Sequence, residues 1–156
     1  MTLNEERKLQ SLVNGINSCV WNLKTLSSLF KEMRNTFRQR SQTRFSAPQW
    51  QIEFDDVRQK LIEISKNLND TKSIPLYPIR ENQLLNIKER ANDIDVCVLD
   101  LEKMSSTLSR WRRRFKRIGL LAKVGGAKCI KKNNVELDDV LNQLTKISND
   151  LKNIGA

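Results

Sequence analysis

The stretch LQSLVNGINSCVWNLKTLSSLFKEMRNTF, residues 9–37, carries the clearest structural pattern in the chain. Its apolar residues recur at intervals of three and four, which places them along one face of an α-helix and is typical of a coiled-coil or bundle seam. Three further apolar residues flank this seam and predict contact with more than one neighbouring helix. The seam is Leu9, Leu12, Ile16, Cys19, Leu23, Leu26, Phe30, Met33 and Phe37, and the flanking residues are Val13, Val20 and Leu29.

The pattern predicts a first helix over residues 3–40. Thr2 is suited to cap it, and Glu5, three residues later, completes a capping box. Gly15 is the weak point of the helix, since glycine costs about 1 kcal/mol relative to alanine in a helix interior. Trp21 falls opposite the seam, so we expect it to be an exposed contact residue or to pack against a neighbouring element.

Two further helices follow, over residues 48–69 and 78–118. Pro48 suits the first turn of the former helix, and the polar cluster and two prolines in residues 69–78 predict a loop after it. In the latter helix the seam shifts by a three-residue step at Met104, which moves it toward a new partner or overwinds it locally.

A fourth helix is expected over residues 133–154. Gly119, Gly125 and Gly126 interrupt the periodic pattern before it, and Asn133 with Glu136 matches a second capping box. The chain is therefore expected to form one domain, residues 1–156, of the all-α class: an elongated antiparallel helical bundle or coiled coil of about four helices.

Two of the expected helices are longer than the other two by roughly 20–30 Å at 1.5 Å per residue. Their extra length would expose apolar seam unless another chain covers it. This difference predicts other helical chains as partners, in a hetero-complex or a homo-oligomer.

Composition argues against catalysis. The chain has no histidine, and three cysteines at positions 19, 97 and 129 are too widely spaced for a zinc site. Gly125-Gly126 lacks the spacing of a phosphate-binding loop. We therefore expect a non-enzymatic protein without metal or cofactor. The odd cysteine count and the lack of an apolar leader favour a reducing, cytoplasmic or nuclear location.

Charge gives the strongest functional signal. Residues 110–132, RWRRRFKRIGLLAKVGGAKCIKK, form a basic window with ten of the 28 Lys and Arg residues and none of the 18 Asp and Glu residues. The formal net charge of +10 therefore arises within this window. Such bias exceeds that of an ordinary solvated helix face, which mixes both signs.

Three interpretations of the window remain open. It could contact an acidic partner, either nucleic acid or an acidic protein surface, because arginine pairs with phosphate and tryptophan stacks on bases. It could lie on a membrane as a basic amphipathic segment, which we rank below the first. Alternatively, Trp111, Phe115 and Ile118 continue the core seam, and the cations form a solvated face or an import signal.

Residues 34–44 add further arginines. In an up-down bundle the first and third helices run in the same direction, so their basic ends would meet at one pole. The candidate partner-binding residues are Arg110, Trp111, Arg112, Arg113, Arg114, Phe115, Lys116, Arg117, Lys123, Lys128, Lys131, Lys132, Arg38, Arg40 and Arg44, with Trp21 as a separate exposed candidate. The leading hypothesis is a helical subunit or adaptor of a multi-protein assembly, and the alternative is a self-associating nucleic-acid-binding protein.

Overall fold

The computed structural model contains four helices: α1 (Leu3–Arg40), α2 (Gln51–Ser73), α3 (Arg80–Arg117) and α4 (Gly126–Lys152). It describes the backbone of residues 2–40, 51–73, 80–117 and 126–155. Side-chain environments are described for residues 2–29, 31, 54–71, 80–107, 109, 110, 113 and 137–155. No strand occurs in these ranges, and the predicted all-α helical bundle is confirmed.

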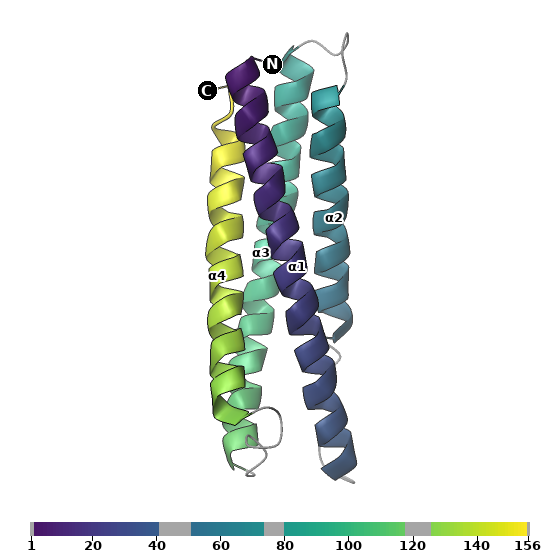
Figure 1. The fold of residues 1–156 in the computed structure, drawn as a ribbon, viewed down its shortest axis with the longest axis vertical. Helices are drawn as coiled ribbons and strands as arrows, with labels where there is room; N and C mark the ends of the chain where they lie inside the picture. The colour runs from purple at the N-terminus through teal and green to yellow at the C-terminus, as the bar shows by residue number, and fades with distance from the viewer. Residues whose placement is uncertain (1, 41–50, 74–79, 118–125, 156) are drawn as a thin grey trace.

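The helices alternate in direction and form a ring. Contacts join α1 to α2 and α4, and join α3 to the same two helices, so α1 and α3 lie on a diagonal. Figure 1 shows both chain termini at one end of the bundle and the C-terminal ends of α1 and α3 at the other. This is the up-down topology that short connections between antiparallel helices produce.

The predicted seams meet in one core. Side chains from all four helices are buried there. Near the chain termini the core contains Leu9, Leu68, Ile87 and Leu151, and at its other described end it contains Leu26, Phe54, Met104 and Leu137. Val13 is buried, and Val20 and Leu29 pack at the edge of this core, as expected for a helix with two neighbours. Over the described side chains, the seams are therefore internal to the chain.

The first capping box forms as predicted. The backbone N–H of Glu5 donates to Oγ1 of Thr2 at 3.2 Å, and the backbone N–H of Thr2 donates to Oε1 of Glu5 at 3.1 Å. These bonds satisfy donors that the start of a helix leaves unpaired. Arg80, in the first turn of α3, also pairs with Glu5, at 2.7 Å and 3.2 Å. The hydrogen bond from the Thr2 backbone, with the hydroxyl of Thr2 and the Arg80 guanidinium, lowers the pKa of Glu5.

The prediction that α2 ends at residue 69 was wrong. The helix continues through Asn69, Asp70 and Thr71 to Ser73, although these residues resemble a loop in sequence. Thr71 is buried against α3, where its hydroxyl accepts a 2.5 Å hydrogen bond from Nδ2 of Asn86. Tertiary contact of this kind outweighs a weak local helix preference.

The start predicted for the fourth helix was also wrong. The helix begins at Gly126, seven residues before the predicted cap, and Asn133 lies inside it. The second half of the basic window is therefore helical from residue 126, and residues 118–125 lie outside the described backbone. In Figure 1 this early part of α4 and the end of α3 lie at the same end of the bundle.

Gly15 lies where α1 meets α4. A Cβ atom added at this position would be 3.0 Å from Cδ1 of Ile147. The residue that weakens the helix locally thus leaves room for the side chain of the neighbouring helix.

Candidate functional site

Most of the cationic candidates lie on three helix ends at one end of the molecule. We define the basic end as residues 34–40 of α1, 110–117 of α3 and 126–132 of α4. In Figure 1 these segments lie at the bottom of the bundle, opposite the termini. The alternating helix directions bring the segments to the same end, although more than 60 residues separate the first from the second in sequence.

The basic end carries one sign of charge along the chain. Six cations belong to its α3 segment, three to α1 and three to α4, and none of the segments contains Asp or Glu. Arginine makes up most of this set, and its planar guanidinium can pair with a carboxylate or a phosphate through two hydrogen bonds.

The individual candidates differ in how they are placed. The side chains of Arg110 and Arg113 are exposed. For the other candidates within helices, the structure describes the backbone only. These residues are Trp111, Arg112, Arg114, Phe115, Lys116, Arg117, Lys128, Lys131, Lys132, Arg38 and Arg40. Arg44 and Lys123 lie outside the described residues. Segments of three helices thus lie at one end of the bundle, and their action as one binding site stays a prediction.

Trp21 is separate from the basic end. Its side chain is 68% exposed in the first half of α1, so its predicted outward position is confirmed. The ammonium of Lys24 lies 5.5 Å from the ring centroid, a distance at which a cation is attracted to the ring face. Because this contact is at the surface, it leaves the remaining ring area open to solvent.

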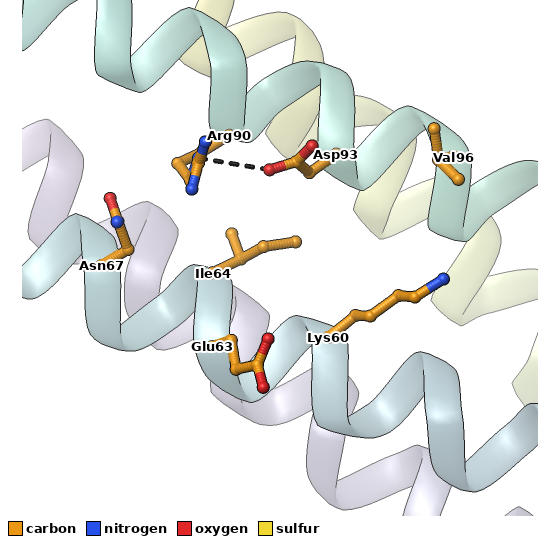
Figure 2. A pocket seen from close by; sticks show the side chains of 7 residues that line it. All are labelled: Lys60, Glu63, Ile64, Asn67, Arg90, Asp93 and Val96. Atoms are coloured by element: carbon orange, nitrogen blue, oxygen red, sulfur yellow. Dashed lines mark ion pairs between the residues drawn. The ribbon is translucent and has the colours of Figure 1, made fainter.

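A shallow groove between α2 and α3, of about 460 Å³, was not predicted from sequence. Figure 2 shows it lined by Lys60, Glu63, Ile64 and Asn67 from α2 and by Arg90, Asp93 and Val96 from α3. The sequence did not predict how α2 aligns with α3, so the groove could not be located from it. The available sequence signal was a pair of opposite charges on each wall, Lys60 with Glu63 on α2 and Arg90 with Asp93 on α3.

The groove contains both signs of charge. Nε of Arg90 is buried and forms an ion pair with Oδ2 of Asp93 at 3.2 Å, without hydrogen-bond geometry. Lys60 and Glu63 lie on the opposite wall (Figure 2). Since its two cations are matched by two carboxylates, the groove has no excess of one sign of charge among its lining residues.

Two cysteines are buried between the helices. Burial raises the pKa of Cys19 to about 12 and that of Cys97 to about 11. Both thiols are therefore protonated at neutral pH and poorly nucleophilic. Among the described residues, no group of three His, Cys, Asp or Glu side chains is arranged to hold a metal ion.

Within the described part of the chain, no helix combines the length and the apolar character needed to cross a membrane. Comparison with protein-family models, with curated proteins and with solved structures finds no match for the chain. Functional inference therefore depends on the geometry and charge of the molecule itself.

Proposed function

We propose that this protein is a non-enzymatic helical subunit or adaptor that uses its basic end to hold an acidic polymer or surface. The observation that carries the proposal is the gathering of twelve Lys and Arg residues, and no Asp or Glu, on three helix segments at one end of the bundle. A concentration of one sign of charge raises the local concentration of oppositely charged partners and speeds their association.

The closed core refines how partners are expected to bind. Seam residues of all four helices are buried against one another up to Leu26, Phe54, Met104 and Leu137. A partner helix cannot use these positions without opening the bundle. The proposal therefore assigns partner contact to the basic end and to exposed residues such as Trp21, rather than to the full length of the seams.

Direct binding of nucleic acid is the second candidate. The α3 segment of the basic end contains five arginines and one lysine within eight residues, and arginine binds phosphate bidentately. If six of these cations met phosphates of duplex DNA, the affinity would fall with salt at a log–log slope of about −5. A cytoplasmic or nuclear location is part of the same proposal, and a membrane surface ranks third.

The test measures binding of the full chain to four fluorescent anionic probes over a range of salt concentrations. The probes are duplex DNA, single-stranded RNA, a poly-glutamate peptide and vesicles with anionic lipid. We expect at least one probe to bind at low salt, and binding to weaken at least tenfold in the double variant Arg110→Glu/Arg113→Glu. Both side chains are exposed, so their reversal leaves the described core intact.

A matched control reverses two exposed lysines away from the basic end, Lys66→Glu/Lys146→Glu. It changes the net charge equally and is expected to weaken binding much less, because the local field and not the total charge selects the partner. Equal losses in the two double variants, or no binding to any probe, would overturn the proposal.

A further inference from the structure

Helix α3 carries a second periodic series on the side opposite the core. Starting at Leu85, its residues are spaced by four and three in alternation, so they lie along one line of the helix. The core residues Ile87, Ala91 and Ile94 lie about half a turn around the helix from this line. All members of the series are exposed, and we call them the outer face of α3: Leu85, Glu89, Asn92, Val96, Leu99 and Lys103.

This face is apolar for the solvent side of a bundle helix, which is normally polar. Leu85, Val96 and Leu99 are exposed by 57%, 50% and 58%. They are half of the six large apolar side chains that are exposed in the described part of the chain, and the other three are spread over α1 and α2. Single exposed apolar residues need no explanation, whereas apolar residues aligned at heptad spacing indicate a face for another helix.

The charged residues of the outer face are placed symmetrically about Val96. Glu89 lies seven residues before it and Lys103 seven residues after it, about 10 Å on either side. If a second copy packs its α3 antiparallel with Val96 at the twofold axis, Glu89 of each copy lies opposite Lys103 of the other. In a parallel pair each of these residues would instead meet its own equivalent, and like charges would repel. The outer face therefore complements itself in the antiparallel orientation.

The carboxylate of Glu89 remains accessible for such a contact. Within its own chain it lies 3.6 Å from the guanidinium of Arg90, and its side chain is 55% exposed. Adjacent residues of a helix do not face each other, and exposed ion pairs contribute little stability. The pair with Arg90 is thus a weak competitor for a lysine of a second copy.

Antiparallel pairing also separates the basic ends. Val96 lies near the middle of α3, whereas residues 110–117 lie about 18 residues beyond it. The basic ends of the two copies would be about 50 Å apart, several times the screening length of about 8 Å at physiological salt. The apolar surfaces can therefore meet without bringing the two concentrations of positive charge together.

We infer that the outer face of α3 is a dimer interface, which binds a second copy of this chain in the antiparallel orientation with Val96 at the twofold axis. Val96 and Leu99 of both copies supply the apolar contact near the axis. A Glu89–Lys103 pair on each side sets the register and the orientation. The inference goes beyond the proposed function, because it assigns no contact to the basic end.

The test measures self-association of the full chain by analytical ultracentrifugation over a range of protein concentrations. We expect the parent to form a dimer. Glu89→Lys and Lys103→Glu should each weaken dimerisation at least tenfold, because each places two pairs of like charge in the interface. An equal mixture of the two variants should restore the affinity of the parent, because in the mixed dimer every lysine opposes a glutamate.

Matched controls reverse exposed charges on α4, with Asp139→Lys for the first variant and Lys146→Glu for the second. They change the net charge equally and should leave the dimer unchanged. Circular dichroism of every variant separates loss of folding from loss of association.

Disulfide trapping tests the orientation. In a Cys129→Ser background, where the remaining Cys19 and Cys97 are buried, Val96→Cys should form a disulfide-linked dimer with oxidised glutathione. Leu85→Cys should not, because the two copies of residue 85 lie about 33 Å apart along an antiparallel pair. A parallel pair would link both variants.

A parent chain that stays monomeric at every concentration would overturn the inference. So would a dimer that neither charge reversal weakens, or a mixture of the two variants that fails to restore association. Equal disulfide linkage through positions 85 and 96 would overturn it as well, because the antiparallel pair brings only position 96 to its own copy.

Discussion

Ser27 of α1 donates a 3.0 Å hydrogen bond to the carboxylate of Asp55, near the start of α2. The serine side chain is buried, whereas the aspartate is partly exposed and also faces Lys31 at 3.7 Å. This bond lies at the last level where the described core contains all four helices. It therefore helps to set the register of α1 against α2 at this level.

Replacing Ser27 by alanine should lower the free energy of unfolding by about 1 kcal/mol, the usual net contribution of such a bond. In a double-mutant cycle with Asp55→Ala, which removes the acceptor, the two substitutions should couple by about 0.5–1 kcal/mol. Urea unfolding of the four proteins measures both quantities. Additive effects would show that the hydrogen bond does not hold α2 to α1 at this level.

The contact between Gly15 and Ile147 makes a size-dependent prediction. Gly15→Ala should change stability little, because a helix-propensity gain of up to about 1 kcal/mol opposes a 3.0 Å contact with Cδ1 of Ile147. Gly15→Leu should destabilise by about 1–3 kcal/mol through overpacking. Adding Ile147→Ala to Gly15→Leu should recover part of the loss. A leucine variant as stable as the parent in thermal unfolding would contradict the close approach of α1 and α4.

Asp95 gives a prediction about pH. Burial alone would raise its pKa, but hydrogen bonds from Lys152 at 2.6 Å and Ser148 at 2.5 Å, with the lysine charge, bring it below the ordinary 3.8. A depressed pKa contributes stability that is present above the unfolded-state value and is lost as the pH falls through the folded-state value. Asp95→Asn should therefore lose less stability than the parent between pH 5 and about pH 2.

The matched control is Asp139→Asn, an exposed aspartate near the start of the described core region of α4. It removes the same charge from an exposed position outside the Asp95 site, and so shows how much of the change comes from net charge alone. Because Asp95 and Lys152 are both partly exposed, the effect of Asp95→Asn at neutral pH should stay below about 1 kcal/mol. Denaturant unfolding at each pH measures these differences, and identical pH profiles for Asp95→Asn and the parent would contradict the assigned contacts.

The buried thiols provide a probe of bundle opening. With pKa values of about 12 and 11, Cys19 and Cys97 should react with an alkylating or disulfide reagent at pH 8 at least about a hundredfold more slowly in the folded chain than in denaturant. A Cys129→Ser background isolates these two residues. Rapid stoichiometric labelling of either thiol in the folded state would show that the helices around it are not closed.

Much of the architecture was predictable from heptad spacing alone. The bounds of α1 and the Thr2–Glu5 capping box followed from the sequence because both depend on residues within a few positions of one another. The buried seam followed because the apolar period of residues 9–26 leaves a single face to bury.

The errors arose where tertiary contact decides local structure. In the sequence, Thr71 resembles part of a loop. In the structure, its hydrogen bond with Asn86 of α3 stabilises the last turn of α2. Asn133 resembles a helix cap in sequence, yet α4 begins at Gly126, at the same end of the bundle as the end of α3. The contact between Thr71 and Asn86 is not encoded within a short window of sequence. The groove around Arg90 was missed for a similar reason, since the α2–α3 alignment that forms it was not predicted.

Charge was more informative about the candidate site than periodicity. The basic window was evident from its ten cations, and the common direction of the first and third helices placed Arg38 and Arg40 near it. The early start of α4 could not be foreseen, and it adds Lys128, Lys131 and Lys132 to the helical part of this end.

Whether the three segments act together is testable by charge reversal in α1. Arg38→Glu/Arg40→Glu should weaken binding of the same anionic probe that Arg110→Glu/Arg113→Glu weakens, because all four residues lie on helix segments at one end. The measurement is the dissociation constant at low salt for each double variant and for their combination. If the dissociation constant of the probe is the same for Arg38→Glu/Arg40→Glu as for the parent, the binding site lies on α3 and α4 only.

The most direct test of the central claim is an NMR titration of the ¹⁵N-labelled chain with a poly-glutamate peptide at low salt, recorded amide by amide and repeated with duplex DNA. We expect the largest shifts in all three segments of the basic end, residues 34–40, 110–117 and 126–132, for whichever probe binds. Amides around Leu9, Ile87 and Leu151, at the opposite end of the core, should barely move. Shifts centred on the α2–α3 groove or on the terminal end, with the basic end unaffected, would show that the basic end is not the binding site.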